Sequence, residues 1–253
     1  MGKREANFRL RASFVGFLLC LTALSQGVTQ ELRIVSLAPN WTNVVAALGA
    51  AGNLVGVTRY CIFPDSIPRL VKEGKLEVVG GLTDIDVRKV EALHPDVILT
   101  CTGLQSSLRK KFSAEGYKVV HMDEAGLKEV YTKILDLGKA IGRERNAETL
   151  VDSIRTGLKS VVAKYAGKPK VKVYYEINYA YKCVPGKDSY ITELMKMVGA
   201  EPVFSDRAGI APSVSWEEIV EANPDVILVP LWENAGGPLL LRRLGRLRYN
   251  DAL

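Results

Sequence analysis

Two nearly identical segments constrain this chain more than any other feature of its sequence. Residues 90–99 read VEALHPDVIL and residues 220–228 read VEANPDVIL, so they differ only where Leu93-His94 stands against Asn223. In each copy an amphipathic run stops before a proline, which ends helices, and a run typical of a buried strand follows. The helix-ending tendency explains the two prolines but not the shared V-E-A and D-V-I-L. We therefore predict a duplicated helix–strand unit, one copy in each of two lobes.

Short apolar runs alternate with amphipathic runs along most of the chain. The strand-like runs are residues 33–38, 54–57, 78–79, 96–101, 118–121 and 171–177. The helices predicted among the first five runs are residues 44–48, 86–93 and 104–115. Strands that alternate with helices at short spacing indicate parallel βαβ units.

The middle of the chain has a different pattern. From Leu127 to Tyr165 no strand-like run occurs, apolar residues recur at helical spacing, and Gly142 divides the stretch. A helix of about 20 residues spans roughly 30 Å, the length of a small domain. The predicted boundaries are residues 1–25 for a signal peptide, 26–125 for a first lobe, 126–168 for a linking helical segment and 169–253 for a second lobe.

The N-terminus indicates export. Basic residues up to Arg11 precede an apolar run at residues 12–24. The small residues Ala23 and Ser25 then stand at the spacing of a signal-peptide cleavage site. This order is typical of a secretory signal, and the run is shorter than the ~20 residues that span a bilayer. Cys20 follows the bulky Leu19, which favours a place in the apolar run over lipidation. Whether the segment is cleaved, lipidated or retained as an anchor stays open.

Composition argues against nucleic-acid binding and against a site for a bare metal ion. The net charge of +6 comes largely from basic residues near the two ends, so no basic face remains. Three cysteines follow the predicted signal peptide, Cys61, Cys101 and Cys183, so they cannot all pair in disulfides, and their spacing fits no metal-binding motif. We therefore expect them to be buried as small hydrophobic side chains. His94 and His121 are the only histidines, too few for a dedicated zinc or copper site. We expect no cofactor, and a metal that binds should arrive already chelated.

Motifs for catalysis are lacking, so we predict that the chain is not an enzyme. The run Gly186-Lys187-Asp188 resembles the end of a phosphate-binding loop, but Tyr181 stands in place of its leading glycine. Asp188 also replaces the required serine or threonine. No G-x-S-x-G occurs, and no G-x-G-x-x-G follows the first strand. A ligand sensor or surface-binding domain without a transport role is the main alternative, and an α/β enzyme is a weaker one.

Motifs in a fixed order along about 200 residues resemble one known family. The segments are RIVSLAPNWTNVVAALGA at 33–50, LVGVTRYCIFP at 54–64, VGG at 79–81, VEALHPDVILTCTG at 90–103, GKDSYITELMKMVGAEPVF at 186–204 and VSWEEIVEANPDVILV at 214–229. Together they resemble the rigid-helix (class III) periplasmic substrate-binding proteins of ABC importers for cobalamin, heme and ferric siderophores. The GVTRYCIFP segment is most similar to the cobalamin binders.

The resemblance implies an α/β fold of two lobes, each with a central parallel sheet flanked by helices, joined by one long rigid α-helix. It implies an extracytoplasmic solute-binding component of an ABC importer, in the periplasm or at the outer face of the cytoplasmic membrane. Such a protein, expected to be a monomer, would capture a metal chelate between its lobes and deliver it to a permease and its ATPase. Cobalamin is the first expectation, and a ferric siderophore or heme is the next.

Ligand-binding candidates lie where predicted strands end, because open parallel sheets bind ligands at their carboxyl edges. They are Asn40, Trp41, Arg59, Tyr60, Phe63, Thr102, Gly103, Tyr179, Tyr181 and Trp232. Aromatic side chains there suit a broad chelate, and Arg59 could pair with a carboxylate or phosphate. Trp41 has a second interpretation, packing within its own lobe. If the ligand were heme, Tyr60 or Tyr181 could be its axial ligand.

The resemblance also implies that an acid on each lobe pairs with arginines of the permease. In the second lobe this position matches Glu217, with Glu218 beside it. In the first lobe it falls on Arg88, a departure that leaves Asp84 or Asp86 as a substitute, although both also suit a helix cap. Family members continue with a strand and a helix after the Trp232 region, whereas this chain ends in an Arg-rich run, leaving open whether its second lobe is complete.

Overall fold

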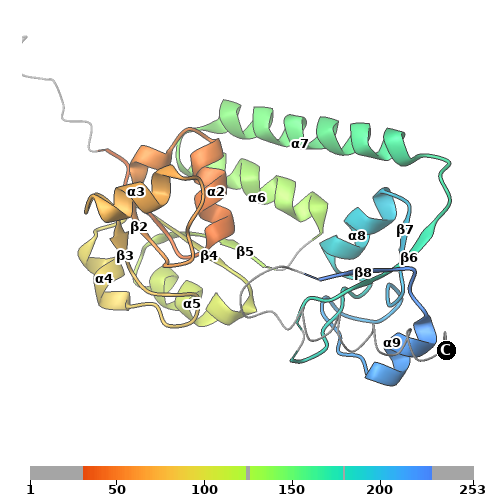
Figure 1. The fold of residues 1–253 in the computed structure, drawn as a ribbon. Coiled ribbons are helices and arrows are strands. Elements are labelled where there is room, and N and C mark those ends of the chain that lie inside the picture. Colours follow the sequence, from red (N-terminus) through yellow and green to blue (C-terminus); the bar gives the residue numbers. More distant parts are fainter. Residues whose placement is uncertain (1–30, 124–125, 179, 230–253) are drawn as a thin grey trace, which may run out of the picture. The chain divides into compact units, whose positions relative to one another are not determined.

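The computed structural model describes residues 31–123, 126–178 and 180–229 (Figure 1). The expected signal peptide, Tyr179, Trp232 and the end of the second lobe lie outside the described residues. The predicted fold class is confirmed: two α/β lobes contain parallel sheets, and a long helix joins them.

The first lobe is built on a five-stranded parallel sheet with strand order β3-β2-β1-β4-β5. Its strands are β1 (Ile34–Ser36), β2 (Leu54–Val57), β3 (Glu77–Val78), β4 (Val97–Cys101) and β5 (Lys118–Met122). Every residue of β1 and β4 is buried, which explains why both read as continuous apolar runs. Alternate residues belong to two separate cores, Ile34 to one and Val35 to the other, so both faces of the sheet are covered.

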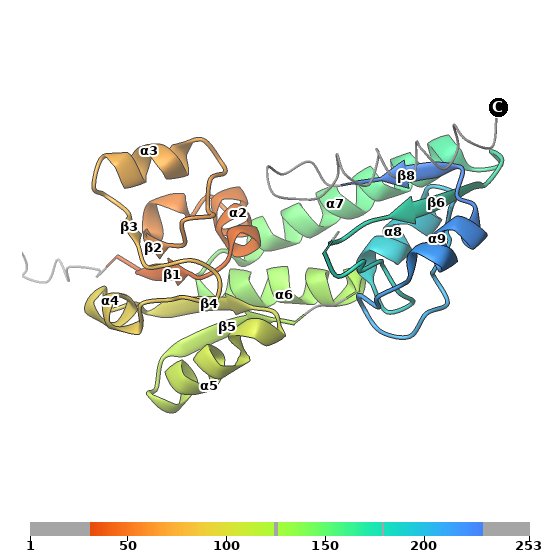
Figure 2. The same ribbon diagram turned by 60° about the horizontal axis from the view of Figure 1, so that its bottom comes forward.

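Helices cover the two faces of this sheet (Figure 2). They are α2 (Pro39–Ala47), α3 (Ser66–Lys72), α4 (Val87–Ala92) and α5 (Ser106–Ala114), with 3-10 turns at Ala51–Asn53 and Gly103–Gln105. Helix α2 begins at Pro39, five residues before the predicted start, because proline is well suited to the first helical position. Thr42 therefore lies inside the helix, where its hydroxyl donates to Ser36 Oγ at 2.9 Å.

Two helices follow the first lobe and lie side by side in Figures 1 and 2. These are α6 (Leu127–Ala140) and α7 (Glu144–Tyr165), separated near Gly142 as predicted. The helices approach so closely at Gly138 that a Cβ there would overlap the side chain of Ala147. At 22 residues, α7 is about 33 Å long.

The second lobe has a three-stranded parallel sheet with strand order β7-β6-β8 in the described residues. Its elements are β6 (Val171–Tyr175), α8 (Tyr190–Met197), β7 (Ala200–Pro202), α9 (Trp216–Ala222) and β8 (Val226–Leu228). Tyr174 of the central strand packs in the core with Phe204 and Ile219. Helix α8 faces the second half of α7 across an apolar cavity of about 250 Å³ lined by Val161 and Met195 among others.

The duplicated unit is present as α4–β4 in the first lobe and α9–β8 in the second. The residue before proline adopts a left-handed conformation in both copies, with φ of 45° at His94 and 42° at Asn223. The aspartate after proline then pairs with the first strand of its lobe. Asp96 accepts from Arg33 N at 2.7 Å, and Asp225 accepts from Lys172 N at 2.9 Å. Both aspartates also donate their own N–H to the same partner's carbonyl, which closes two equivalent backbone clasps.

Candidate functional site

The carboxyl ends of the five parallel strands meet at one side of the first sheet, which we call the first-lobe edge. It consists of residues 37–41 after β1, 58–64 after β2, 79–84 after β3, 102–105 after β4 and Asp123 after β5. Most of the first-lobe candidates predicted from the sequence lie on these loops. The structure therefore brings segments far apart in sequence to one edge.

Gln105, at the end of the turn that follows β4, fixes the geometry of this edge. Its side chain is fully buried, and its Oε1 accepts from Cys101 N at 2.9 Å. Its Nε2 donates to Leu37 O at 2.8 Å and to Leu82 O at 2.9 Å. One amide group thus ties together the segments that follow β1, β3 and β4. The sequence shows an amide side chain shortly after a buried strand, but it does not show which backbone groups that amide binds.

Trp41 belongs to the core of the first lobe. Its side chain has no exposed surface, and its Nε1 donates to Thr100 O at 2.8 Å. This position corrects the prediction of a ligand contact, because a fully enclosed ring offers no face to a ligand. Below the edge, Thr100 Oγ1 also contacts His121 Nδ1 at 2.7 Å, and His121 Nε2 contacts Asp123 Oδ1 at 2.9 Å. Trp41 and His121 therefore support the edge from beneath.

Exposed aromatic side chains form the outer part of the first-lobe edge. Tyr60 is 55% exposed and Phe63 is 61% exposed, in the loop that follows β2. Ile62 between them is also exposed, as is Leu104 on the neighbouring loop. Asn40 is exposed at the first turn of α2. Large apolar side chains exposed on loops at the carboxyl edge of a sheet are typical of a binding surface.

Arg59 is already paired. Its guanidinium donates to both carboxylate oxygens of Asp84, at 3.1 and 2.6 Å, and its charge lies over the ring of Tyr60. The hydrogen bond to Arg59 lowers the pKa of Asp84, and the bond to Asp84 raises the pKa of Arg59. Gly81 lies directly beneath the pair, so close that a Cβ there would overlap both side chains. An anionic ligand would have to compete with Asp84 for this arginine.

Thr102 and Gly103 lie at the turn that leaves β4. Thr102 has a φ of 59°, a conformation that a β-branched residue adopts only under strain. Its Oγ1 is buried without a hydrogen-bond partner among the described residues. Gly103 is exposed and has open space around it. Strain and an unpaired hydroxyl at a strand end are both associated with functional sites.

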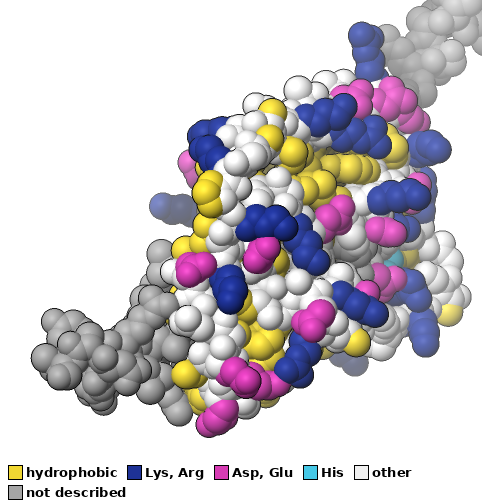
Figure 3. Space-filling model, turned by 90° about the vertical axis from the view of Figure 1, so that its right-hand side faces the viewer, with side chains coloured by type: hydrophobic (Ala, Val, Ile, Leu, Met, Phe, Trp, Pro, Cys, Tyr) yellow, Lys and Arg dark blue, Asp and Glu magenta, His cyan; other side chains and the backbone are white. Residues whose placement is uncertain are grey.

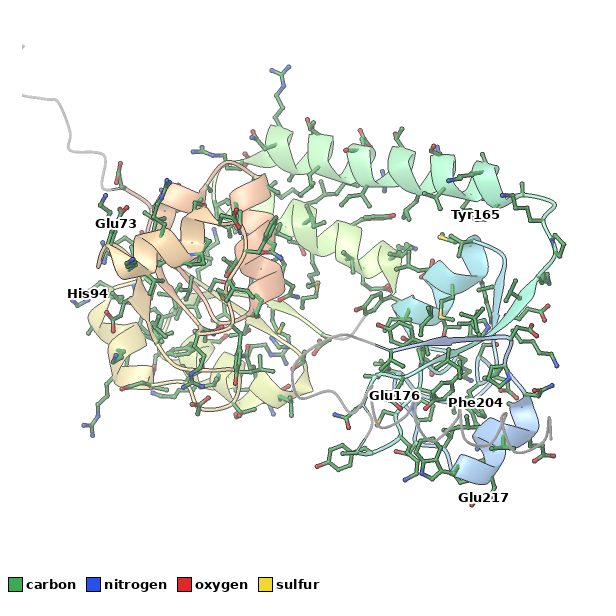
Figure 4. All side chains as sticks on the ribbon, viewed as in Figure 1. Glu73, His94, Tyr165, Glu176, Phe204 and Glu217 are labelled. Carbon is green, nitrogen blue, oxygen red and sulfur yellow. The ribbon has the colours of Figure 1, made fainter. Side chains whose placement is uncertain are left out.

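The second-lobe candidates are only partly within the described residues. Tyr181 is 72% exposed, and its N–H donates to Asn178 Oδ1 at 3.1 Å. Glu176, which directly follows β6, is 1% exposed in the interior of this lobe (Figure 4). Burial raises the pKa of Glu176, and the neighbouring Tyr174 opposes that shift. The sequence pattern predicts Glu176 within a strand and contains no sign of this environment.

The predicted docking acids differ in their surroundings, and Asp84 is already paired with Arg59. Asp86 caps α4, accepting from Arg88 N at 3.0 Å and Lys89 N at 3.2 Å. Glu218 forms a capping box with Ser215 and an ion pair with Arg207, and these contacts lower its pKa. Glu217 is exposed on α9 and projects away from the sheet (Figure 4).

The structure also bears on charge, cysteines and metals. On the face shown in Figure 3, basic and acidic side chains are intermixed. Cys61 and Cys101 are buried as expected, but Cys183 is partly exposed. Within the described ranges, no three His, Cys, Asp or Glu side chains come together as a group that could hold a metal ion. Across the same ranges, every helix is too short or too polar to cross a membrane.

A cavity of about 590 Å³ lies elsewhere in the second lobe. Its lining includes Lys170, Lys172 and Glu201. Lys170 and Lys172 lie at the start of β6, and Glu201 is the middle residue of β7. The lining contains none of the ligand-binding candidates predicted from the sequence, so we do not assign the ligand site to this cavity.

Two parallel-sheet lobes joined by a long helix define a substrate-binding protein of the class III periplasmic type. A periplasmic heme-binding protein from Pseudomonas aeruginosa shares this fold, with a TM-score of 0.68 and 22% identity, covering 83% of this chain and 76% of that one. The family model described as periplasmic binding protein matches residues 34–238. The chain belongs to this family, whose members are extracytoplasmic binding proteins of ABC transporters rather than enzymes.

Two relatives are similar in sequence over most of the chain. An uncharacterised ABC transporter substrate-binding lipoprotein of Bacillus subtilis is 33% identical over 217 residues, covering 81% of this chain and 67% of the relative. A vitamin B12-binding protein of Vibrio vulnificus is 26% identical over 213 residues, covering 84% of this chain and 76% of the relative. The expected family is therefore confirmed.

Proposed function

We propose that this protein captures cobalamin outside the cytoplasmic membrane and delivers it to an ABC permease and its ATPase. The observation that carries the proposal is the set of exposed aromatic side chains on the first-lobe edge, Tyr60 and Phe63 above all. A corrin is broad and partly apolar, so flat ring faces bury much of its surface at low entropic cost. The similarity to vitamin B12-binding proteins supports the same ligand.

The test is a calorimetric titration of the full chain with cobalamin. We expect saturable one-to-one binding with a Kd of about 1 μM or tighter. Tyr60→Ala should weaken binding by about tenfold, because an exposed aromatic anchor is lost. Tyr165→Ala removes a partly exposed tyrosine at the far end of α7 and should leave the affinity unchanged. Failure of the folded protein to bind cobalamin would reject this ligand, and tight binding of heme or a ferric siderophore would replace it.

Docking to the permease is the second part of the proposal, with Glu217 as the second-lobe contact. An exposed carboxylate such as that of Glu217 can pair with an arginine across an interface. Asp86 and Glu218 would have to keep their capping contacts while they docked. In a transport assay with the cognate permease, Glu217→Gln should reduce uptake, whereas cobalamin binding by the isolated protein should not change. Equal uptake by the variant would remove Glu217 from the interface.

A further inference from the structure

The first-lobe edge, all of whose residues are described, carries a single lysine or arginine. This residue is Arg59, and the acidic residues of the edge are Asp84 and Asp123. The side chains of Arg59 and Asp84 are 48% and 59% exposed, so a ligand that rests on the edge can reach both. The side chain of Asp123 is 66% exposed. A ligand on this edge therefore meets more acidic than basic side chains.

The backbone holds Asp84 opposite Arg59. The segment after β2 is joined to the segment after β3, because Arg59 N donates to Gly80 O at 2.9 Å. The turn that contains Asp84 is closed on itself, since Asp86 N donates to Val79 O at 2.8 Å. The two charged residues are thus brought together by main-chain contacts in addition to the contacts of their side chains.

The side chains then pair through two hydrogen bonds. Arg59 Nη1 and Nη2 donate to Asp84 Oδ1 and Oδ2 at 3.1 and 2.6 Å, so one side of the guanidinium is fully used. Gly81 leaves room for this pair, because a Cβ there would overlap the ends of both side chains. The hydrogen bond from Arg59 lowers the pKa of Asp84, which keeps its carboxylate charged at neutral pH.

This pair has a consequence for binding that differs from its effect on stability. Exposed ion pairs contribute little to stability, whereas like charges brought together across an interface weaken binding. An anionic group on the ligand would have to displace Asp84 from Arg59 and then lie beside a second negative charge. A neutral amide on the ligand meets no such repulsion. The periphery of cobalamin carries primary amides, whereas heme carries carboxylates.

We propose that Asp84 determines the charge specificity of the ligand site: by pairing with Arg59 it makes the first-lobe edge reject anionic groups and accept neutral ones. This inference rests on the proposed function, because it takes the first-lobe edge as the ligand site. It names the substrate class more narrowly, as chelates whose contact with this edge is uncharged. It also predicts that loss of the Asp84 charge turns Arg59 into an anion-binding residue.

The experiment titrates the full chain with ligands that differ in charge. The probes are cobalamin, its monocarboxylic derivatives, in each of which one amide is hydrolysed, and heme. Asp84→Asn keeps the size of the side chain and removes its charge. Affinity for at least one carboxylate-bearing probe should therefore rise about tenfold, and the rise should shrink at high salt. Affinity for cobalamin should stay within about threefold of wild type. A purely structural role for Asp84 would lower the affinity for every probe.

Two further variants test whether the pair itself is responsible. Gly81→Ala pushes the two side chains apart and keeps both charges, so affinity for carboxylate-bearing probes should rise by a smaller factor, about threefold. Asp65→Asn removes an exposed acid just beyond the same loop and leaves the pair intact. All affinities of this control variant should stay within about twofold of wild type.

The outcomes separate this inference from the proposed function. If the wild-type protein does not bind cobalamin, the proposed ligand is rejected, and the comparison of Asp84→Asn with wild type on heme still decides the role of Asp84. The inference is overturned if folded Asp84→Asn binds no carboxylate-bearing probe more tightly than wild type does. It is also overturned if Asp65→Asn gives the same rise. Should Asp84→Asn fail to fold, Gly81→Ala decides, and an unchanged affinity for every carboxylate-bearing probe would overturn the inference.

Discussion

Replacing Gln105 with methionine tests whether one buried amide fixes the first-lobe edge. Methionine fills nearly the same volume, so little cavity forms. The change removes three hydrogen bonds, so Cys101 N and Leu37 O in the interior and the partly buried Leu82 O lose this partner. Each unpaired buried group costs about 1–3 kcal/mol. Because loops can relax toward water, we expect values near the low end, a loss of about 3–5 kcal/mol in the free energy of unfolding.

Equilibrium unfolding in urea measures this loss, with tryptophan fluorescence as the signal because Trp41 lies in the first-lobe core. The midpoint should fall markedly while the slope with urea stays constant. Leu104→Met changes the exposed neighbour of Gln105 and should shift the free energy of unfolding by less than about 0.5 kcal/mol. A loss below about 1 kcal/mol in Gln105→Met would refute the idea that this side chain holds the edge together.

Three further predictions concern helix ends, helix packing and pH. Ser215→Ala removes the capping box of α9 and should lower stability by about 1 kcal/mol, measured by thermal unfolding. Gly138→Val places a branched side chain where α6 meets α7 and should cost about 1–3 kcal/mol in urea unfolding. Asp84 has a lowered pKa in the folded state, so the small stabilisation from its pair with Arg59 is present above the ordinary pKa of 3.8. It should disappear as the pH falls through the lowered value, and Asp84→Asn should remove this pH dependence; an unchanged profile would argue against the pair.

The strands and the duplicated unit can be predicted from sequence because they depend on local patterns. Buried parallel strands read as continuous apolar runs, and proline ends the preceding helix in both copies. The same patterns place the start of α2 too late, because Pro39 suits a strand end and a first helical position equally well. The correct strands and the misplaced start of α2 therefore have the same cause, since both predictions use only local sequence patterns.

The site is harder to predict because its geometry depends on contacts between distant segments. Gln105 bonds to a carbonyl 68 residues away, and Arg59 to a carboxylate 25 residues away. Neither separation has a sequence signature. Trp41 is ambiguous for the same reason, since an aromatic residue after a strand can face a ligand or the core. Glu176 has no local signal at all, because its unusual state comes from burial and from the lack of an ion-pair partner among the described residues.

The paired aspartate clasps have a consequence for inheritance. Each clasp closes within its own half of the chain, on one carboxylate and two backbone groups, so neither half needs the other to form its helix-to-strand corner. Recombination between related genes can then exchange one half and keep both corners intact. One half can then accumulate substitutions that suit a new ligand while the sequence of the other half stays the same.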